Sequence, residues 1–262
     1  MAAESAWRLG VFLTTFAVMA LAEAAAPRRA RTRPRLRRWP VNLGLTVLST
    51  ALVRLLAPVG VMGLAAHGQA HGWGLLPRLP ADPRVAGLAA FVLLDLAVYL
   101  QHLLMHRVPL LWRLHRVHHC DEDMDATTAV RFHPVEMLVS LALKAAVVVA
   151  VGAPPAAVLV FEIVLNAAAL FNHANWRLPA ALDRVLRTVL VTPDMHRVHH
   201  STQVEEQNTN FGFNLPWWDR LFGTYRGQPA GGHQLMRVGL ADVPDPGSFA
   251  GVLRLPFGGR IS

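Results

Sequence analysis

The sequence has little charge, one cysteine and one lysine. Only 16% of its 262 residues are charged, whereas about 25% is typical of a soluble domain. The single cysteine, Cys120, excludes a disulfide framework and a thiolate zinc cluster. A disordered chain needs high charge and low hydrophobicity, and the hydrophobic content of 53% excludes that class. The composition therefore indicates a membrane protein that forms one integrated unit.

Positive charge comes almost entirely from arginine, and the positions of the arginines indicate the role of this charge. The formal net charge is +8, which can indicate a nucleic acid or a membrane surface as partner. Seven arginines lie between two apolar segments of membrane-spanning length, a pattern that the positive-inside rule explains and that argues against nucleic acid binding. These are Arg28, Arg29, Arg31, Arg33, Arg35, Arg37 and Arg38.

Four apolar segments are long enough to cross a bilayer, which takes about 20 residues. They cover residues 7–26, 41–66, 85–105 and 138–171. The last is too long for one span, and the Gly-Ala-Pro-Pro sequence at residues 152–155 predicts a hairpin of two short helices there. The arginines after the first segment favour a signal anchor over a cleaved secretory signal. We expect an all-α, polytopic membrane bundle of about four to five spans.

The arginine distribution also predicts the orientation of the chain. With the N-terminus and the loop at residues 67–84 outside, the arginine run, residues 107–136 and the chain after residue 173 lie in the cytoplasm. We therefore expect a protein of a bacterial inner membrane whose cytosolic helical cap carries the histidine clusters. The expected divisions are N-terminal membrane helices and loops (1–84), a histidine-rich domain (85–226) and a C-terminal tail (227–262).

Eight of the 13 histidines fall into three short motifs. These are HxxxH (His102, His106) and two HxxHH motifs (His115, His118, His119 and His196, His199, His200). Residues at i, i+3 and i+4 share one face of a helix, so each HxxHH motif presents three imidazoles together. Imidazole clusters of this kind favour a divalent metal such as iron, zinc or copper. Eight ligands exceed what one ion takes, so the count predicts two metals side by side.

Acidic residues near these motifs are candidates for orienting the ligands. Asp95 lies two helical turns before His102 in a predicted span, and we expect it to accept a hydrogen bond from a ligand histidine. Glu136 lies at the start of a predicted helix. It either caps that helix or holds a ligand histidine. Asp194 is expected to cap the helix of the last motif. Three isolated histidines are expected to have no part in the site: His67, His71 and His233.

These motifs resemble the fatty acid hydroxylase / sterol desaturase superfamily. The matching strings are D-x-x-x-Y-x-x-H-x-x-x-H (residues 95–106), HRVHH (115–119), FHPxE (132–136), NHAN (172–175), MHRVHH (195–200), NTNFG (208–212) and WDRLFGTY (218–225). The resemblance covers residues 85–226. It does not reach the first two predicted spans or the C-terminal tail.

The resemblance implies a membrane-bound non-haem di-iron enzyme that uses O2 to hydroxylate or desaturate a fatty acyl or sterol-like lipid. Hydroxylation is the preferred reading, and zinc can replace iron in the purified protein. It implies that His173 completes the ligand set, although Arg177 stands where some members have a second histidine. His133 matches the His-Pro element of the family, and its role as a ligand or as a residue near the substrate stays open. No flavin, nicotinamide or haem-attachment motif is present, so electrons must come from a ferredoxin- or cytochrome-type donor.

Two other classes of function compete with this interpretation. A membrane electron-transfer protein with histidine-ligated haem would carry histidine pairs at two depths across its spans, and would show a Soret band. A non-catalytic metal-binding or transport protein would carry acids or histidines in the outer halves of several spans, where this sequence has almost none.

Overall fold

Long apolar helices make up most of the molecule, and the computed structural model describes them within residues 2–258. Five helical segments are long and apolar enough to cross a membrane. They are α1 (Ala2–Ala25), α2 (Arg35–Leu56) with α3 (Gly60–Ala70), α4 (Pro83–Arg107), α6 (Pro134–Val151) and α7 (Pro155–Asn172). Residues 2–258 contain no strand, only two isolated β-bridges. The predicted all-α bundle of four to five spans is confirmed.

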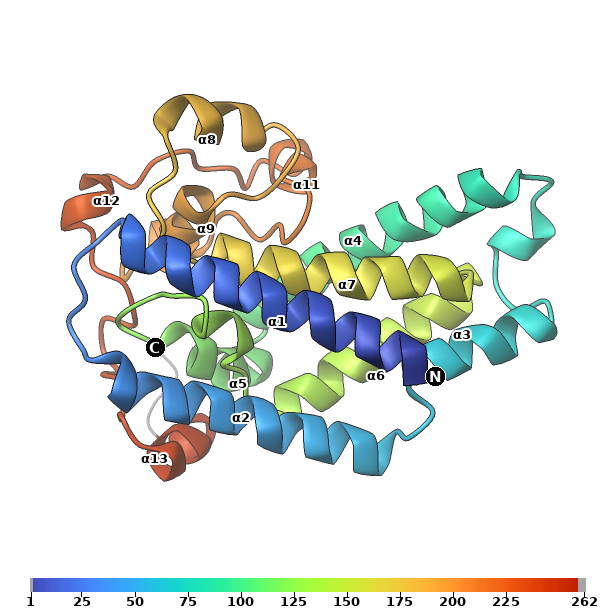
Figure 1. Cartoon of the computed structure of the whole chain (residues 1–262), viewed down its shortest axis with the longest axis horizontal. Helices are drawn as coiled ribbons and strands as arrows, with labels where there is room; N and C mark the ends of the chain where they lie inside the picture. The colour runs from blue at the N-terminus through green and yellow to red at the C-terminus, as the bar shows by residue number, and fades with distance from the viewer. Residues whose placement is uncertain (1, 259–262) are drawn as a thin grey trace.

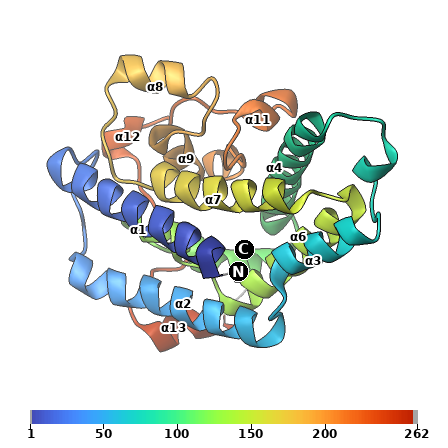
Figure 2. The ribbon, with the colours of Figure 1, turned by 45° about the vertical axis from the view of Figure 1, so that its right-hand side comes forward.

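Short helices gather at one end of the bundle (Figure 1). They are α5 (Pro109–His119), α8 (Ala180–Leu186), α9 (Pro193–His199), α10 (Val204–Gln207), α11 (Trp217–Leu221), α12 (Gly232–Leu235), α13 (Phe249–Arg254) and the 3-10 turns Thr128–Val130 and Leu255–Phe257. These elements share that end with the arginine run. A further 3-10 turn, Leu76–Arg78, lies between α3 and α4. Figure 2 shows α8, α9, α11 and α12 together on one side of α7. The loop between α3 and α4 lies at the opposite end.

The second predicted span is broken into two helices. α2 ends at Leu56 and α3 begins at Gly60, with Pro58 between them. Proline cannot donate a helical hydrogen bond, and Gly60 has a φ of +60° that favours glycine. The span predicted over residues 41–66 therefore lies within the candidate span Arg35–Ala70, which is divided between two helices. α3 also continues to Ala70, into the segment that was predicted to be a loop.

The predicted hairpin at residues 152–155 is confirmed. Gly152 ends α6 with a φ of +69°, a left-handed conformation that glycine adopts without steric cost. A Cβ atom there would lie 2.3 Å from the carbonyl oxygen of Trp73, so the close approach of the α3–α4 loop also requires glycine. Pro155 then starts α7 at a position where its missing N–H costs nothing.

The apolar core lies where α3, α4, α6 and α7 meet. Leu94, Val158 and Phe161 are completely or almost completely buried there. α1 packs along α7, and α2 packs along α6. Many apolar side chains on the outer helix faces are exposed, including Leu21 and Val47 at 70% each. Lipid-facing surfaces account for such exposure in a membrane bundle.

One ion cluster lies within the spanning helices. The carboxylate of Glu162 on α7 is 2.9 Å from Lys144 Nζ on α6 and 2.7 Å from the Arg8 guanidinium on α1. Glu162 is only 5% exposed, and buried charges within a membrane require such partners. The cluster joins three helices, and the sequence interpretation did not single out Glu162.

Candidate metal centre

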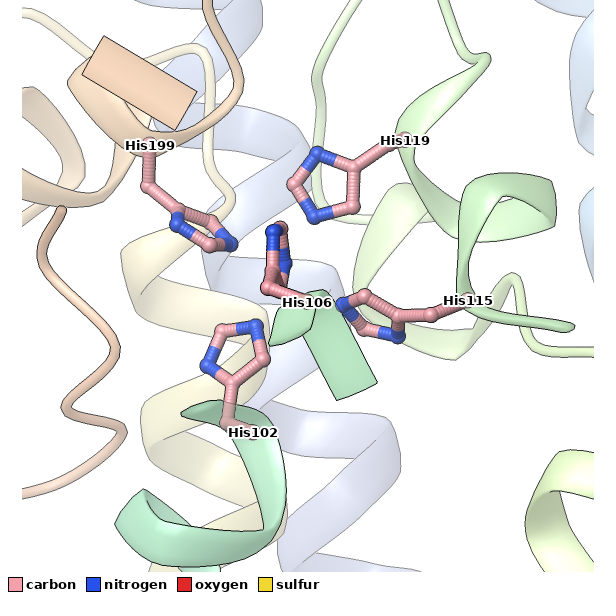
Figure 3. Close-up of side chains that lie close together, drawn as sticks. All are labelled: His102, His106, His115, His119 and His199. Carbon is pink, nitrogen blue, oxygen red and sulfur yellow. The ribbon is translucent and has the colours of Figure 1, made fainter. Parts of the chain in front are cut away.

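The nine histidines predicted as ligands converge into two groups. The first group contains His102, His106, His115, His119 and His199, and the second contains His118, His173, His196 and His200. One ring nitrogen from each residue lies within 4.8 Å of those of its group. Figure 3 shows the five rings of the first group pointing toward one another. All nine are buried except His106, which is half-buried.

Each HxxHH motif is divided between the two groups. On α5, His115 and His119 enter the first group, whereas His118 enters the second. The last motif contributes His199 to the first group, and the other two histidines to the second. The rings of His119 and His200 stack with their centroids 4.4 Å apart. The motifs therefore interleave, and the two groups are immediate neighbours.

Backbone carbonyls fix the orientation of three histidine rings. Nδ1 of His102 lies 2.8 Å from the Phe211 carbonyl oxygen, and Nδ1 of His199 lies 2.8 Å from that of Thr209. His173 makes the same contact, also at 2.8 Å, with Ala169. Because a carbonyl only accepts, each Nδ1 is the donor. Nε2 is then left with a lone pair, as metal ligation requires.

Glu136 fixes a fourth ring. Its Oε1 lies 2.6 Å from Nδ1 of His115, and both side chains are 3% exposed. Of the two roles considered for Glu136, the structure therefore shows that it holds a histidine. The cap of α6 is instead His133, whose Nδ1 accepts a hydrogen bond from the backbone N–H of Val135. His133 belongs to neither histidine group.

Many of the other ring nitrogens lack protein partners. Nε2 of His102, His106, His115 and His199 are all buried without a hydrogen bond, as are both ring nitrogens of His119 and of His200. In the second group, Nε2 of His173 lies 3.1 Å from Nε2 of His118 and of His196. Buried polar atoms are nearly always satisfied in folded proteins. A bound cation in each group would take one ring nitrogen from each histidine. The residues present therefore fit two divalent ions held by imidazole.

Electrostatics keeps these imidazoles neutral. Burial lowers the pKa of His118, His119, His196 and His200 well below the ordinary value, and the neighbouring histidines lower each pKa further. Burial also lowers the pKa of His173 and of His199 to about 3. Neutral imidazole is the form that binds a metal, so these six histidines need no deprotonation near neutral pH.

Asp95 does not hold a histidine, so that prediction is wrong. Its Oδ2 accepts hydrogen bonds from Trp218 Nε1 at 2.8 Å and from the backbone N–H of Leu215 at 3.3 Å. The acid thus attaches the segment around α11 to α4. The same segment supplies the Phe211 carbonyl that contacts His102. Asp95 therefore supports the site indirectly, through the segment that supplies the Phe211 carbonyl. Residue spacing alone could not show this.

A second acid, Asp219, holds the backbone at Phe211, whose carbonyl contacts His102. The sequence interpretation missed this residue. Its two carboxylate oxygens accept hydrogen bonds from the backbone N–H groups of Phe211 and Gly212, each at 2.8 Å. Burial raises the pKa of Asp219 to about 6. The available signal was the WDRLFGTY string, in which Asp219 is the acid.

Several arginines of the basic run bind acids next to the histidine motifs. The Arg38 guanidinium lies 2.6 Å from an Asp121 carboxylate oxygen and 2.7 Å from one of Asp125, just after the motif on α5. Arg28 lies 2.9 Å from the Asp194 carboxylate, just before the last motif. Asp194 was predicted to cap α9, but the residue that caps this helix is Thr192. The run therefore also holds both HxxHH segments in place.

The three histidines expected to lie outside the site do so. His67 and His71 lie next to each other, their ring centroids 4.2 Å apart, at the end of α3. His233 lies 3.5 Å from the Asp194 carboxylate. Among residues 2–258, none of the three belongs to a histidine group that could hold a metal.

Comparisons with known proteins identify the family. Residues 87–224 match the family described as fatty acid hydroxylase. The chain is 29% identical over 232 residues to the ornithine lipid hydroxylase OlsE of Rhizobium tropici, covering 85% of this chain and 68% of that protein. It is 29% identical over 189 residues to the alkylglycerol monooxygenase of Xenopus tropicalis (71% of this chain, 41% of that protein). It is 31% identical over 163 residues to the cholesterol 25-hydroxylase of Rattus norvegicus (59% and 52%).

The chain thus spans about two thirds of the first relative and about half or less of the other two. No solved structure matches it. The family match covers α4 through the segment after α11, which contains all nine converging histidines. The chain belongs to the fatty acid hydroxylase family.

Proposed function

We propose that this protein is an O2-dependent di-iron oxidoreductase that hydroxylates a membrane lipid. The observation that carries the proposal is the pair of buried histidine groups, in which many ring nitrogens lack protein partners. They lie at one end of helices that are apolar enough to span a membrane. The family match and three relatives named as hydroxylases or monooxygenases support lipid oxidation.

The two groups would hold one metal ion each, and the ions would supply the oxidising power that side chains lack. In hydroxylation, one oxygen atom of O2 enters a C–H bond and the other leaves as water, with two electrons and two protons from outside. Imidazole also binds zinc, so zinc in the purified protein is compatible with iron as the working metal. The chain's own task is to hold the ligands, which Glu136 and the Phe211 and Thr209 carbonyls do.

An external carrier of ferredoxin or cytochrome type would deliver the electrons. The substrate would be a fatty acyl or sterol-like lipid that reaches the site from the bilayer. We place the site on the cytoplasmic side of a bacterial inner membrane, because α5 and α9, which carry histidines of both groups, share one end of the bundle with the arginine run (Figure 1). Residues 85–226 would form the catalytic part, flanked by residues 1–84 and 227–262.

Lipid profiling of cells with and without the chain tests this proposal. We expect a lipid species heavier by one oxygen atom only in cells that express the native chain. A matched strain that expresses His199→Ala, which removes one member of the first group, should lack that species. Identical lipid profiles in all strains, or a haem Soret band in the purified protein, would contradict the proposal.

A further inference from the structure

A cavity of about 160 Å³ lies beside the first histidine group. Its wall includes His106, and it also includes Trp112 and Arg116 from α5. The rings of His106 and Trp112 have centroids 4.8 Å apart. Figure 3 shows His106 among the rings of His102, His115 and His199. A molecule in this cavity would therefore lie directly against the first proposed metal site.

The volume limits what can enter. A dry cavity of about 150 Å³ holds a molecule the size of benzene. A sterol ring system is several times larger, so it would not fit in this volume. A head group of several non-hydrogen atoms, or one end of a chain, would fit.

The polar side chains of the wall favour a head group over a hydrocarbon chain. Arg116 is only 4% exposed. Its Nη2 donates to the Leu255 and Gly258 carbonyls, but its Nε has no partner. Gln207 is 8% exposed, and no hydrogen bond joins its side-chain amide to another of residues 2–258. A buried donor without a partner is costly, so the Nε of Arg116 favours a ligand with hydrogen-bond acceptors, and the Gln207 amide can bind the same ligand.

The wall of the cavity also carries a negatively charged side chain. Asp242 lines the cavity with an exposed carboxylate. A wall with a buried guanidinium and a carboxylate is complementary to a ligand that carries both an anionic and a cationic group. Outside the cavity, Leu104 on α4 and Leu110 on α5 are 46% and 72% exposed. Exposed apolar side chains on these two helices suit contact with acyl chains of the bilayer.

We propose that this cavity binds a zwitterionic head group of the lipid substrate. The anionic group of the head meets Arg116 and Gln207, and its ammonium group meets Asp242. This inference rests on the proposed function and deepens it. Because the cavity reaches His106, the oxidised carbon lies in the head group or within a few bonds of it, rather than far along the acyl chain.

Binding of three related probes to the purified, zinc-loaded protein tests the inference. The first probe is a single-chain acyl lipid whose diamino acid head has a free carboxylate and a free amine. The second is its methyl ester, and the third is its N-acetyl derivative. We expect the zwitterion to bind about tenfold or more tightly than either derivative, because each derivative loses one charged contact. Equal affinities for the three probes would overturn the inference.

Variants assign each contact. Asp242→Asn should weaken binding of the zwitterion about tenfold and leave the N-acetyl probe unchanged. Gln207→Leu should weaken binding of the zwitterion and of the N-acetyl probe, with a smaller effect on the methyl ester. Glu205→Gln is the matched control, since Glu205 is an exposed carboxylate on α10 that does not line the cavity. An effect of Glu205→Gln equal to that of Asp242→Asn would also overturn the inference.

This experiment is independent of turnover. Zinc-loaded protein binds the probes without oxidising them, so the affinities do not depend on iron or O2. If iron-loaded protein oxidised no lipid but the zwitterion preference persisted, the proposed function would fail and the binding site would stand. If lipid oxidation occurred without that preference, the outcome would be the reverse.

Discussion

The Glu136 carboxylate lies 2.6 Å from Nδ1 of His115, and both side chains are buried. This contact leaves Nε2 of His115 free to face the first histidine group. Among the four rings with a fixed Nδ1, only His115 is held by a side chain rather than by a backbone carbonyl. Glu136 is therefore the orienting contact that a point substitution can remove.

Substitution of Glu136 tests its role as a positioning residue. Partners that orient metal-bound histidines typically change metal affinity about 10- to 100-fold. We expect Glu136→Ala to weaken zinc binding by that amount, and Glu136→Gln, whose amide oxygen still accepts a hydrogen bond, to restore much of it. Competition with a chelator of known affinity measures both. A Glu136→Ala variant with native zinc affinity would show that the contact does not orient the ligand.

The division of the α5 motif between the two groups predicts separable losses of metal. His119 belongs to the first group and His118 to the second. Each single alanine variant should therefore retain about one ion per chain, and the double variant fewer. Elemental analysis of the purified variants gives the ion count. If both single variants kept two ions, these histidines would not be required ligands.

Arg38 and Arg37 form a matched pair for the role of the basic run. Arg38 is buried between Asp121 and Asp125, and removing one partner of a buried ion pair costs about 3–5 kcal/mol. Arg38→Ala should therefore lower the Tm markedly. Arg37 is exposed and its side chain makes no hydrogen bond or ion pair within residues 2–258, so Arg37→Ala should leave the Tm nearly unchanged. Equal Tm values for the two variants would exclude the structural role of Arg38.

The same ion pair predicts a direction for the pH dependence of stability. Arg38 lowers the pKa of Asp121 despite its burial. A carboxyl group with a lowered pKa in the folded state stabilises the protein above its ordinary pKa, and this contribution is lost as the pH falls through the folded-state value. Thermal unfolding below about pH 4 should therefore show a steeper loss of stability for the native chain than for Arg38→Ala. Parallel profiles would contradict this linkage.

The sequence predicted the spans and the convergence of the nine histidines because both follow from local spacing. Membrane-length apolar segments need only composition, and the break at residues 152–155 needs only glycine and proline. The helical period of the HxxHH motifs brings their histidines together, and their role as metal ligands stays a prediction. The broken second span was also readable in principle, since Pro58 and Gly60 lie within it.

Other features depend on contacts between distant segments, which spacing does not encode. The partner of Asp95 is Trp218, 123 residues away, and the partner of Arg38 is Asp121, 83 residues away. The positive-inside rule accounts for the arginine run without these ion pairs, so the charge pattern alone gave no reason to expect them. The division of each motif between two groups likewise depends on how α5 and α9 pack.

Single-turnover oxidation of a lipid under O2 labelled with oxygen-18 tests the central claim most directly. Purified, iron-loaded protein would be reduced chemically, mixed with the membrane lipid extract and analysed by mass spectrometry. We expect about two iron ions per chain and a lipid product that carries one oxygen-18 atom, and we expect His199→Ala to give no such product. A product that lacks two hydrogens and carries no label would contradict hydroxylation, and the absence of any oxidised lipid would contradict the proposed function itself.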